Sequence, residues 1–185
     1  MSINVTRQII LCTLLCFLFS LASGCGYTTR SMIADKYSTV YVKPFENRID
    51  ITDETYAANK YRIYRPFLET DITKAVRDKY LFDGNLRPYA EENSDLLLEG
   101  QLIEFARNPL RYDDNDEVSE YRLNLTVDLR LYETREKRLV WEEKGFTGST
   151  TYFTTGSQAK SESAAINEAM SDLARRIVER TVEQW

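Results

Sequence analysis

Residues 121–131 read YRLNLTVDLRL, and their apolar and polar side chains alternate, with every odd-numbered position apolar. Successive side chains of a strand point to opposite faces of a sheet. This period of two is therefore typical of a long, half-buried antiparallel strand with one wet face. Residues 133–137 (ETREK) predict a charged turn, and residues 138–147 (RLVWEEKGFT) predict the return strand of a hairpin.

Further strands are predicted on the N-terminal side of this hairpin. Residues 95–105 (DLLLEGQLIEF) form a strand candidate with Gly100 in its interior, a position that often marks a bulge or bend. Residues 39–45 (TVYVKPF) are β-branched and aromatic, and they predict a first strand that ends or becomes an edge at Pro44. Residues 86–89 are a short strand candidate.

Two amphipathic helices complete the pattern. The first follows Pro66 and ends at residues 83–85 (DGN). The second begins at a cap formed by Ser157 or Ser161 and carries apolar residues at intervals of three and four through residue 185. The order strand, helix, strand meander, helix predicts an α+β fold. Two helices would pack on one face of a mainly antiparallel four-stranded sheet, as a two-layer sandwich.

The N-terminus has the pattern of a bacterial lipoprotein signal. Arg7 precedes the apolar run 9–21, and small residues lead into Cys25. We therefore predict a cleaved signal peptide over residues 1–24, a lipidated Cys25 with a short tether over 25–38, and one domain over 39–185. The alternatives are an ordinary secretory signal or a short apolar helix. Gly26 stands where an aspartate would signal inner-membrane retention, which favours the outer membrane.

Composition excludes several classes of chemistry. The chain has no histidine, and Cys12 and Cys16 lie in the predicted signal peptide, so the usual general base, thiol nucleophile and zinc ligands are missing from the mature chain. Without Arg7, about 23 basic side chains face 29 acidic ones, which argues against nucleic-acid binding. We expect no catalytic residue, no metal site and no cofactor. An enzyme that uses a pair of carboxylates is the remaining enzymatic alternative.

The acidic stretch 113–117 (DDNDE) resembles the start of a calcium-binding loop of the EF-hand type. It has Val118 where that loop needs a glycine, and Asn124 where the loop needs its closing glutamate. We therefore interpret the stretch as a solvated connection between two long strands.

Five segments together resemble one known family. They are GCGY at 24–27, VYVKPFEN at 40–47, SDLLLEGQL at 94–102, EYRLNLTVDLRLYE at 120–133, and the helix AINEAMSDLARRIVERTV at 165–182. In this order, behind a lipidated cysteine, they resemble the lipopolysaccharide (LPS)-assembly lipoproteins, LptE. The resemblance implies a non-enzymatic outer-membrane protein that plugs the β-barrel LPS translocon LptD. Such a protein helps the barrel to assemble and helps LPS to reach the outer leaflet.

The resemblance also implies contacts between basic residues and LPS phosphates. The family's contact near the start of the last helix falls on Lys160. The family's loop contact falls on residues 114–116, which are acidic here, and Arg107 and Arg111 are the nearest cations. A divalent ion could bridge Asp114 and Asp116 to phosphate instead. The alternative for the three cations is that they only keep the surface soluble.

A second function remains open from the sequence. Lipoprotein activators of peptidoglycan synthases also tether a small α+β module to the outer membrane. They need reach across the periplasm, whereas the first predicted strand begins about fourteen residues after Cys25, at most ~50 Å of extended chain. The short tether favours docking to a barrel.

Overall fold

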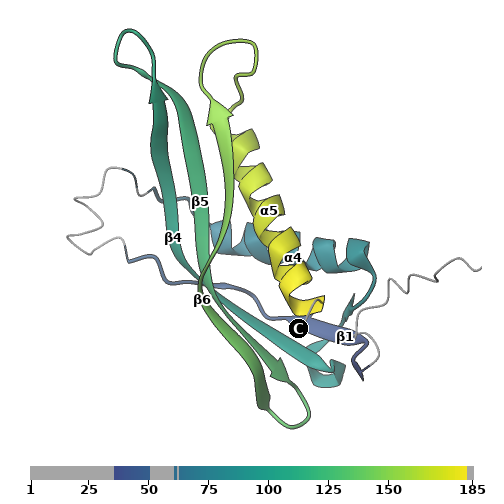
Figure 1. Ribbon diagram of the computed structural model, residues 1–185. Helices are drawn as coiled ribbons and strands as arrows, with labels where there is room; N and C mark the ends of the chain where they lie inside the picture. Colours follow the sequence, from purple (N-terminus) through teal and green to yellow (C-terminus); the bar gives the residue numbers. More distant parts are fainter. Residues whose placement is uncertain (1–35, 51–60, 62, 183–185) are drawn as a thin grey trace, which may run out of the picture.

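The computed structural model describes residues 36–50, 61 and 63–182, so the predicted signal peptide and Cys25 lie outside the described residues (Figure 1). The elements are β1 (Thr39–Val42), β2 (Glu46–Asn47), α4 (Leu68–Asp83), β3 (Arg87–Pro88), the 3-10 helix η1 (Glu91–Asn93), β4 (Leu96–Tyr112), β5 (Val118–Glu133), β6 (Arg138–Phe153) and α5 (Glu162–Val182).

The strands form one mixed sheet in the order β3-β1-β4-β5-β6, with β2 also paired to β4. The three long strands are antiparallel, whereas β1 runs parallel to β3 and β4, and β2 runs parallel to β4. The predicted α+β sandwich with two helices is confirmed, but the prediction of four mainly antiparallel strands is wrong, because the described residues form six strands. The parallel pairing arises at α4. This helical crossover returns the chain to the end of the sheet where β1 began, so β4 runs in the same direction as β1.

The two outer long strands extend further than the sequence predicts. β4 continues to Tyr112 and β6 to Phe153, so residues 148–153, which lie beyond the predicted return strand 138–147, also belong to a strand. Gly100 does not mark the bulge, because the shift in register falls between Leu102 and Glu104. Gly100 instead makes room for Phe45, whose ring would lie 2.2 Å from a Cβ added at position 100.

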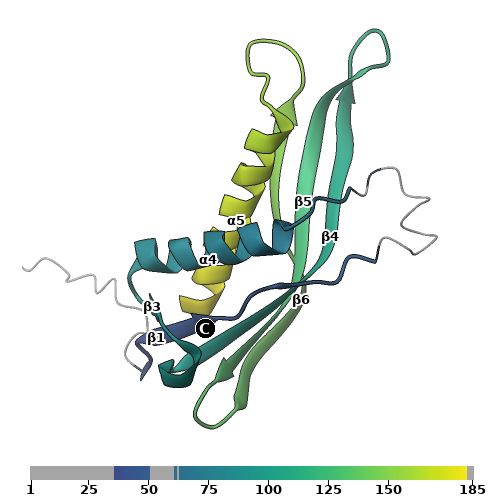
Figure 2. The ribbon, with the colours of Figure 1, turned by 180° about the vertical axis from the view of Figure 1, so that it is seen from behind.

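Both helices lie on one face of the sheet, where α5 runs along β5 and β6 and α4 crosses it (Figures 1 and 2). The alternation that predicted the central strand is confirmed, because all five of its odd-numbered aliphatic side chains are fully buried: Leu123, Leu125, Val127, Leu129 and Leu131. The helices meet where the Tyr80 hydroxyl donates to Thr181 Oγ1 at 2.8 Å. Burial raises the pKa of Tyr80. Ser161 is confirmed as the helix cap, because its Oγ accepts the N–H of Ala164 at 3.2 Å.

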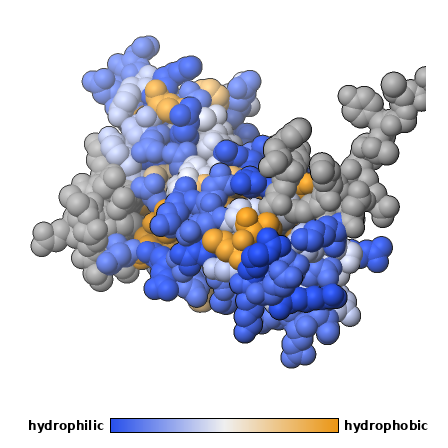
Figure 3. All heavy atoms as spheres, turned by 60° about the horizontal axis from the view of Figure 1, so that its bottom comes forward, coloured by the Kyte–Doolittle hydropathy of each residue, from blue (hydrophilic) through white to orange (hydrophobic). Residues whose placement is uncertain are grey.

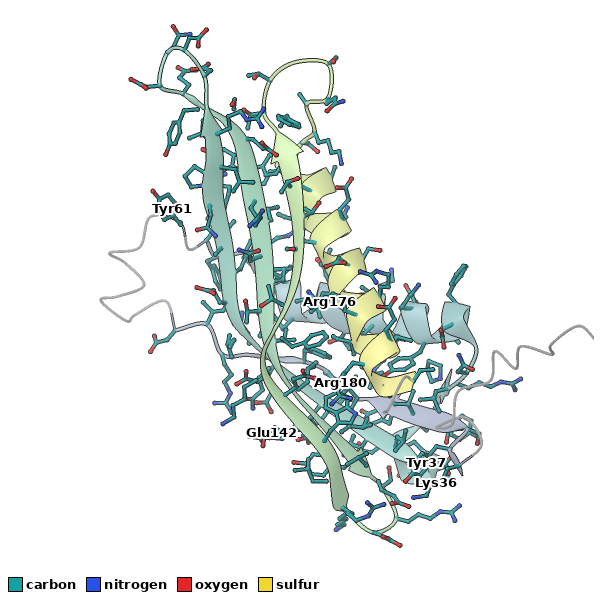
Figure 4. All side chains as sticks on the ribbon, viewed as in Figure 1. Lys36, Tyr37, Tyr61, Glu142, Arg176 and Arg180 are labelled. Carbon is teal, nitrogen blue, oxygen red and sulfur yellow. The ribbon has the colours of Figure 1, made fainter. Side chains whose placement is uncertain are left out.

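Side chains close part of the edge of β6, and a proline interrupts the part of β4 that, within the described ranges, has no neighbouring strand on its outer side. On β6, the N–H of Ser149 donates to Asp172 at 3.0 Å, and Arg176 donates to the carbonyl of Thr147. Both partners come from α5, and Arg176 is labelled in Figure 4. On β4, Pro109 stands two residues after Arg107, whose N–H faces away from β5. A proline at such a position has no N–H to offer a neighbouring chain.

Candidate functional site

The tether joins the domain beside the turn between β5 and β6. Lys36 is the first described residue, and its Nζ lies 3.8 Å from a carboxylate oxygen of Glu133 at the end of β5. Figure 4 shows Lys36 and Tyr37 at this end of the sheet. Asp95 fixes the start of β1 by accepting the backbone N–H groups of Ser38 and Thr39 at 2.9 and 3.1 Å. Burial alone would raise the pKa of Asp95, but these hydrogen bonds hold it below its ordinary value.

The three cations predicted to contact LPS come together at the opposite end, around the end of β6. The Arg107 guanidinium lies 4.9 Å from the centroid of the Tyr121 ring, and that of Arg111 lies 5.9 Å from the Phe153 ring. The backbone N–H of Lys160 donates to the Phe153 carbonyl at 3.0 Å. Residues separated by about 50 positions in the sequence thus share one surface.

Each of these cations is paired with a glutamate. The pairs are Arg107 with Glu162, Arg111 with Glu120 at 3.7 Å, and Lys160 with Glu168 at 2.7 Å. The hydrogen bond from Lys160 lowers the pKa of Glu168. An incoming phosphate would therefore compete with a carboxylate that is already in place.

The acidic loop between β4 and β5 is stabilised by hydrogen bonds from its own backbone N–H groups to one of its aspartates. Asp113 Oδ1 accepts the N–H groups of Asn115 and Glu117, both at 2.9 Å. Within the described residues, no group of three or more acidic, histidine or cysteine side chains is placed to hold a metal ion. Asp114 and Asp116 remain candidates only for a bridging ion shared with a ligand.

A pocket of about 210 Å³ opens beside Arg107. It is lined by Tyr61, Arg107, Pro109, Tyr112, Val118 and Tyr121. The carbonyl of Tyr61 accepts the N–H of Arg107 at 2.6 Å, which brings the tyrosine to the edge of β4 (Figure 4). Sequence reasoning missed this pocket, because no pattern in the sequence shows that Tyr61 lies beside β4.

A second pocket of about 450 Å³ lies between α4 and the chain that follows β1. Its lining residues are Pro44, Phe45, Thr70, Thr73, Lys74, Arg77 and Asp78. Arg77 donates to the carbonyl of Val42 at 3.1 Å, and Thr73 Oγ1 accepts the N–H of Phe45 at 2.9 Å. These bonds hold α4 to the edge of the sheet, so we interpret the pocket as a packing defect of this junction.

The sheet face opposite the helices carries a row of alternating charges. Lys43 lies 2.7 Å from Glu99, and Arg130 lies 3.0 Å from Glu142, while the register places Glu99, Arg130 and Glu142 side by side on β4, β5 and β6. The hydrogen bond to Glu99 raises the pKa of Lys43. The face drawn in Figure 3 is likewise mainly hydrophilic, with small, separate apolar patches.

The comparison with known families decides the assignment. A family model described as lipopolysaccharide-assembly, LptE, matches residues 37–181, from just before β1 to the last turn of α5. The chain belongs to the LptE family. LptE is a non-catalytic family of assembly lipoproteins. No curated protein matches the chain.

Several solved structures are similar to this LptE-family chain at low sequence identity. The PelC dodecamer from Paraburkholderia phytofirmans is 12% identical, with a TM-score of 0.45 over 81% of this chain and 91% of that one. A hypothetical protein from Chlamydia trachomatis is 12% identical, with a TM-score of 0.49 over 78% and 95%. Rare lipoprotein B from Shewanella oneidensis is 15% identical, with a TM-score of 0.40 over 76% and 89%. At these values the assignment rests on the family model.

Membership in LptE identifies the chain as a lipopolysaccharide-assembly lipoprotein of the cell envelope. Neither α4 nor α5, the two α-helices of the described ranges, combines the length and apolar character that a membrane-spanning helix needs.

Proposed function

We propose that the chain is an outer-membrane lipoprotein that plugs the β-barrel LPS translocon LptD, assists its assembly and aids the insertion of LPS into the outer leaflet. The observation that carries this proposal is the LptE family match across the whole folded domain. Signal peptidase would remove residues 1–24, and the lipid on Cys25 would hold the domain 39–185 through the short tether 25–38.

The wet face of the sheet suits the polar interior of a barrel. Four of its charges are already paired, as Lys43 with Glu99 and Arg130 with Glu142. These pairs can be placed against another protein without leaving any of the four charges buried and unpaired, which would be costly. The interior of an outer-membrane barrel is itself polar. The face can therefore lie against a barrel wall without rearranging its ion pairs.

The end of the domain that carries Arg107, Arg111 and Lys160 is the proposed contact for LPS phosphates. Arginine and lysine are the side chains that bind phosphate most strongly. Their glutamate partners weaken each contact. A lipid-tethered protein nevertheless meets its ligand at high effective concentration, so weak contacts are sufficient.

Affinity capture from the native host tests the proposal. The lipidated, tagged protein is recovered from gently solubilised outer membranes, together with a second tagged outer-membrane lipoprotein as control. Stoichiometric recovery of one large β-barrel with this protein alone is the expected result. Recovery of a peptidoglycan synthase without a barrel would overturn the proposal in favour of the activator.

Removing the charge of Glu168 is expected to strengthen the binding of LPS. In the Glu168→Gln variant, Lys160 no longer has a carboxylate at 2.7 Å and is free to donate to phosphate. The pair is exposed, so the gain should be modest, up to about fivefold in affinity. Binding of purified LPS to the immobilised protein measures it.

The matched control is Glu179→Gln on the same helix, which removes one of the two carboxylates paired with Arg175 near the other end of α5. This variant should leave LPS affinity unchanged, and Lys160→Gln combined with Glu168→Gln should abolish the gain. Equal gains from the two single variants would show that only the net charge matters.

A further inference from the structure

Over residues 133–138, at the turn between β5 and β6, three side chains are basic and two are acidic. Arg135 and Lys137 are exposed there, and neither makes an ion pair or hydrogen bond to any other residue that the structure describes. Arg138 is shared between Glu133 and Glu136. The turn therefore presents two unpaired cations to its surroundings.

This turn is also where the tether enters. Lys36 lies 3.8 Å from Glu133, and the N–H of Thr134 donates to the carbonyl of Asp95 at 2.9 Å, next to the start of β1. From Cys25 to Lys36 the chain spans at most ~40 Å even when fully extended. A lipid on Cys25 thus keeps Lys36, which lies beside the turn, within that distance of the membrane surface.

The loop at the other end of the sheet has the opposite charge, and the three cations near it are each paired with a glutamate. The loop between β4 and β5 carries Asp113, Asp114, Asp116 and Glu117, and Figures 1 and 2 show this loop and the β5–β6 turn at opposite ends of the long strands. Strand β5 separates them by ~50 Å at about 3.3 Å per residue. Screening at physiological salt acts within ~8 Å, so neither end neutralises the other.

We infer that the β5–β6 turn binds the anionic phospholipid headgroups of the membrane that holds the lipid anchor. Arg135 and Lys137 donate to headgroup phosphates, and Leu139, 45% exposed immediately after the turn, lies at the level of the headgroups. The same surface repels the acidic loop. Before it enters the barrel, the domain therefore stands with its β4–β5 loop directed away from the membrane. This inference rests on the proposed lipidation of Cys25.

Energy transfer from the far loop measures this orientation without touching the turn. The full-length lipidated protein carries a donor dye on Asn115→Cys and is reconstituted into phosphatidylcholine vesicles with or without phosphatidylglycerol, which also contain an acceptor lipid. We expect lower transfer in the vesicles with phosphatidylglycerol, because the loop is held far from the acceptors. High salt should remove the difference.

The variant pair Arg135→Gln and Lys137→Asn removes both unpaired charges, and asparagine suits the left-handed backbone at position 137 (φ 52°). The ratio of domains whose turn is bound to headgroups to domains whose turn is unbound should fall about fivefold for each charge removed, or about thirtyfold for both. The control pair Arg122→Gln and Lys144→Asn removes the same charge from exposed positions of β5 and β6 and should change nothing.

Four outcomes would overturn the inference. The first two are equal transfer in the two kinds of vesicle and equal effects of the two variant pairs. The third is that added inorganic phosphate, at constant ionic strength, displaces the turn from the headgroups. The fourth is that the turn binds only to native membranes that contain a protein partner. Mass spectrometry of the Cys25 peptide in the same sample separates the two proposals. A lipidated protein that fails to dock overturns only this inference, whereas an unlipidated one overturns the anchor in the proposed function.

Discussion

The Cys25→Ala variant is expected to leave the membrane fraction almost completely. The thiol of Cys25 is the predicted attachment point for several acyl chains, and each buried methylene contributes about 0.8 kcal/mol to membrane binding. The binding of the β5–β6 turn to headgroups is too weak on its own to replace the acyl chains. Fractionation of cells grown with labelled palmitate, followed by detection of the tagged protein and of the label, measures the effect.

Cys12 and Cys16 provide the matched controls, because both lie in the segment that signal peptidase would discard. Alanine at either position should leave labelling and membrane attachment unchanged. A Cys25→Ala protein that still carries palmitate and sediments with membranes would contradict the anchor.

A second large effect is expected from Gly148→Val, which should destabilise the fold by about 3 kcal/mol. A Cβ at position 148 would lie 2.4 Å from Leu173 Cβ and 2.6 Å from the backbone N and Cα of Leu173. Backbone atoms cannot turn aside as a flexible side chain can. Helix α5 would therefore have to move away from β6. Urea unfolding of the mature chain, followed by circular dichroism, gives the change in the free energy of unfolding.

Ser149→Val is the control for this substitution, because residue 149 is exposed and lies next to Gly148 in the same strand. Its backbone N–H would still donate to Asp172. We expect a change within about 0.5 kcal/mol. If the two variants were equally stable, the close approach of α5 to β6 would be incorrect.

The sequence predicted the features that depend on local periodicity. Alternation placed Leu123, Leu125 and Leu129 in the core, and a spacing of three and four identified the buried face of α5. Ser161 was predictable as a cap because a serine before an apolar helix can accept a backbone N–H. Each of these patterns is contained within one element, so no knowledge of neighbouring strands was needed.

Features that depend on pairing between distant segments were not predictable. The parallel direction of β1 follows from the crossover through α4, and the row Glu99, Arg130 and Glu142 follows from the register of three strands. Strand β6 was predicted too short because threonines and a glycine over residues 148–153 do not identify a strand without its partner. Two of the three predicted LPS contacts, Arg107 and Lys160, likewise take their glutamate partners from α5, and Arg111 pairs across the strands with Glu120 of β5.

The closed edges of the sheet restrict how this domain can join any other protein. Along β6 the free backbone groups of Thr147 and Ser149 are occupied by Arg176 and Asp172, and on β4 a proline interrupts the edge. A neighbour therefore cannot extend the sheet by adding a strand there and must recognise side chains instead. Side-chain contacts can be exchanged one at a time during evolution, so partner and plug can diverge together while the fold is preserved.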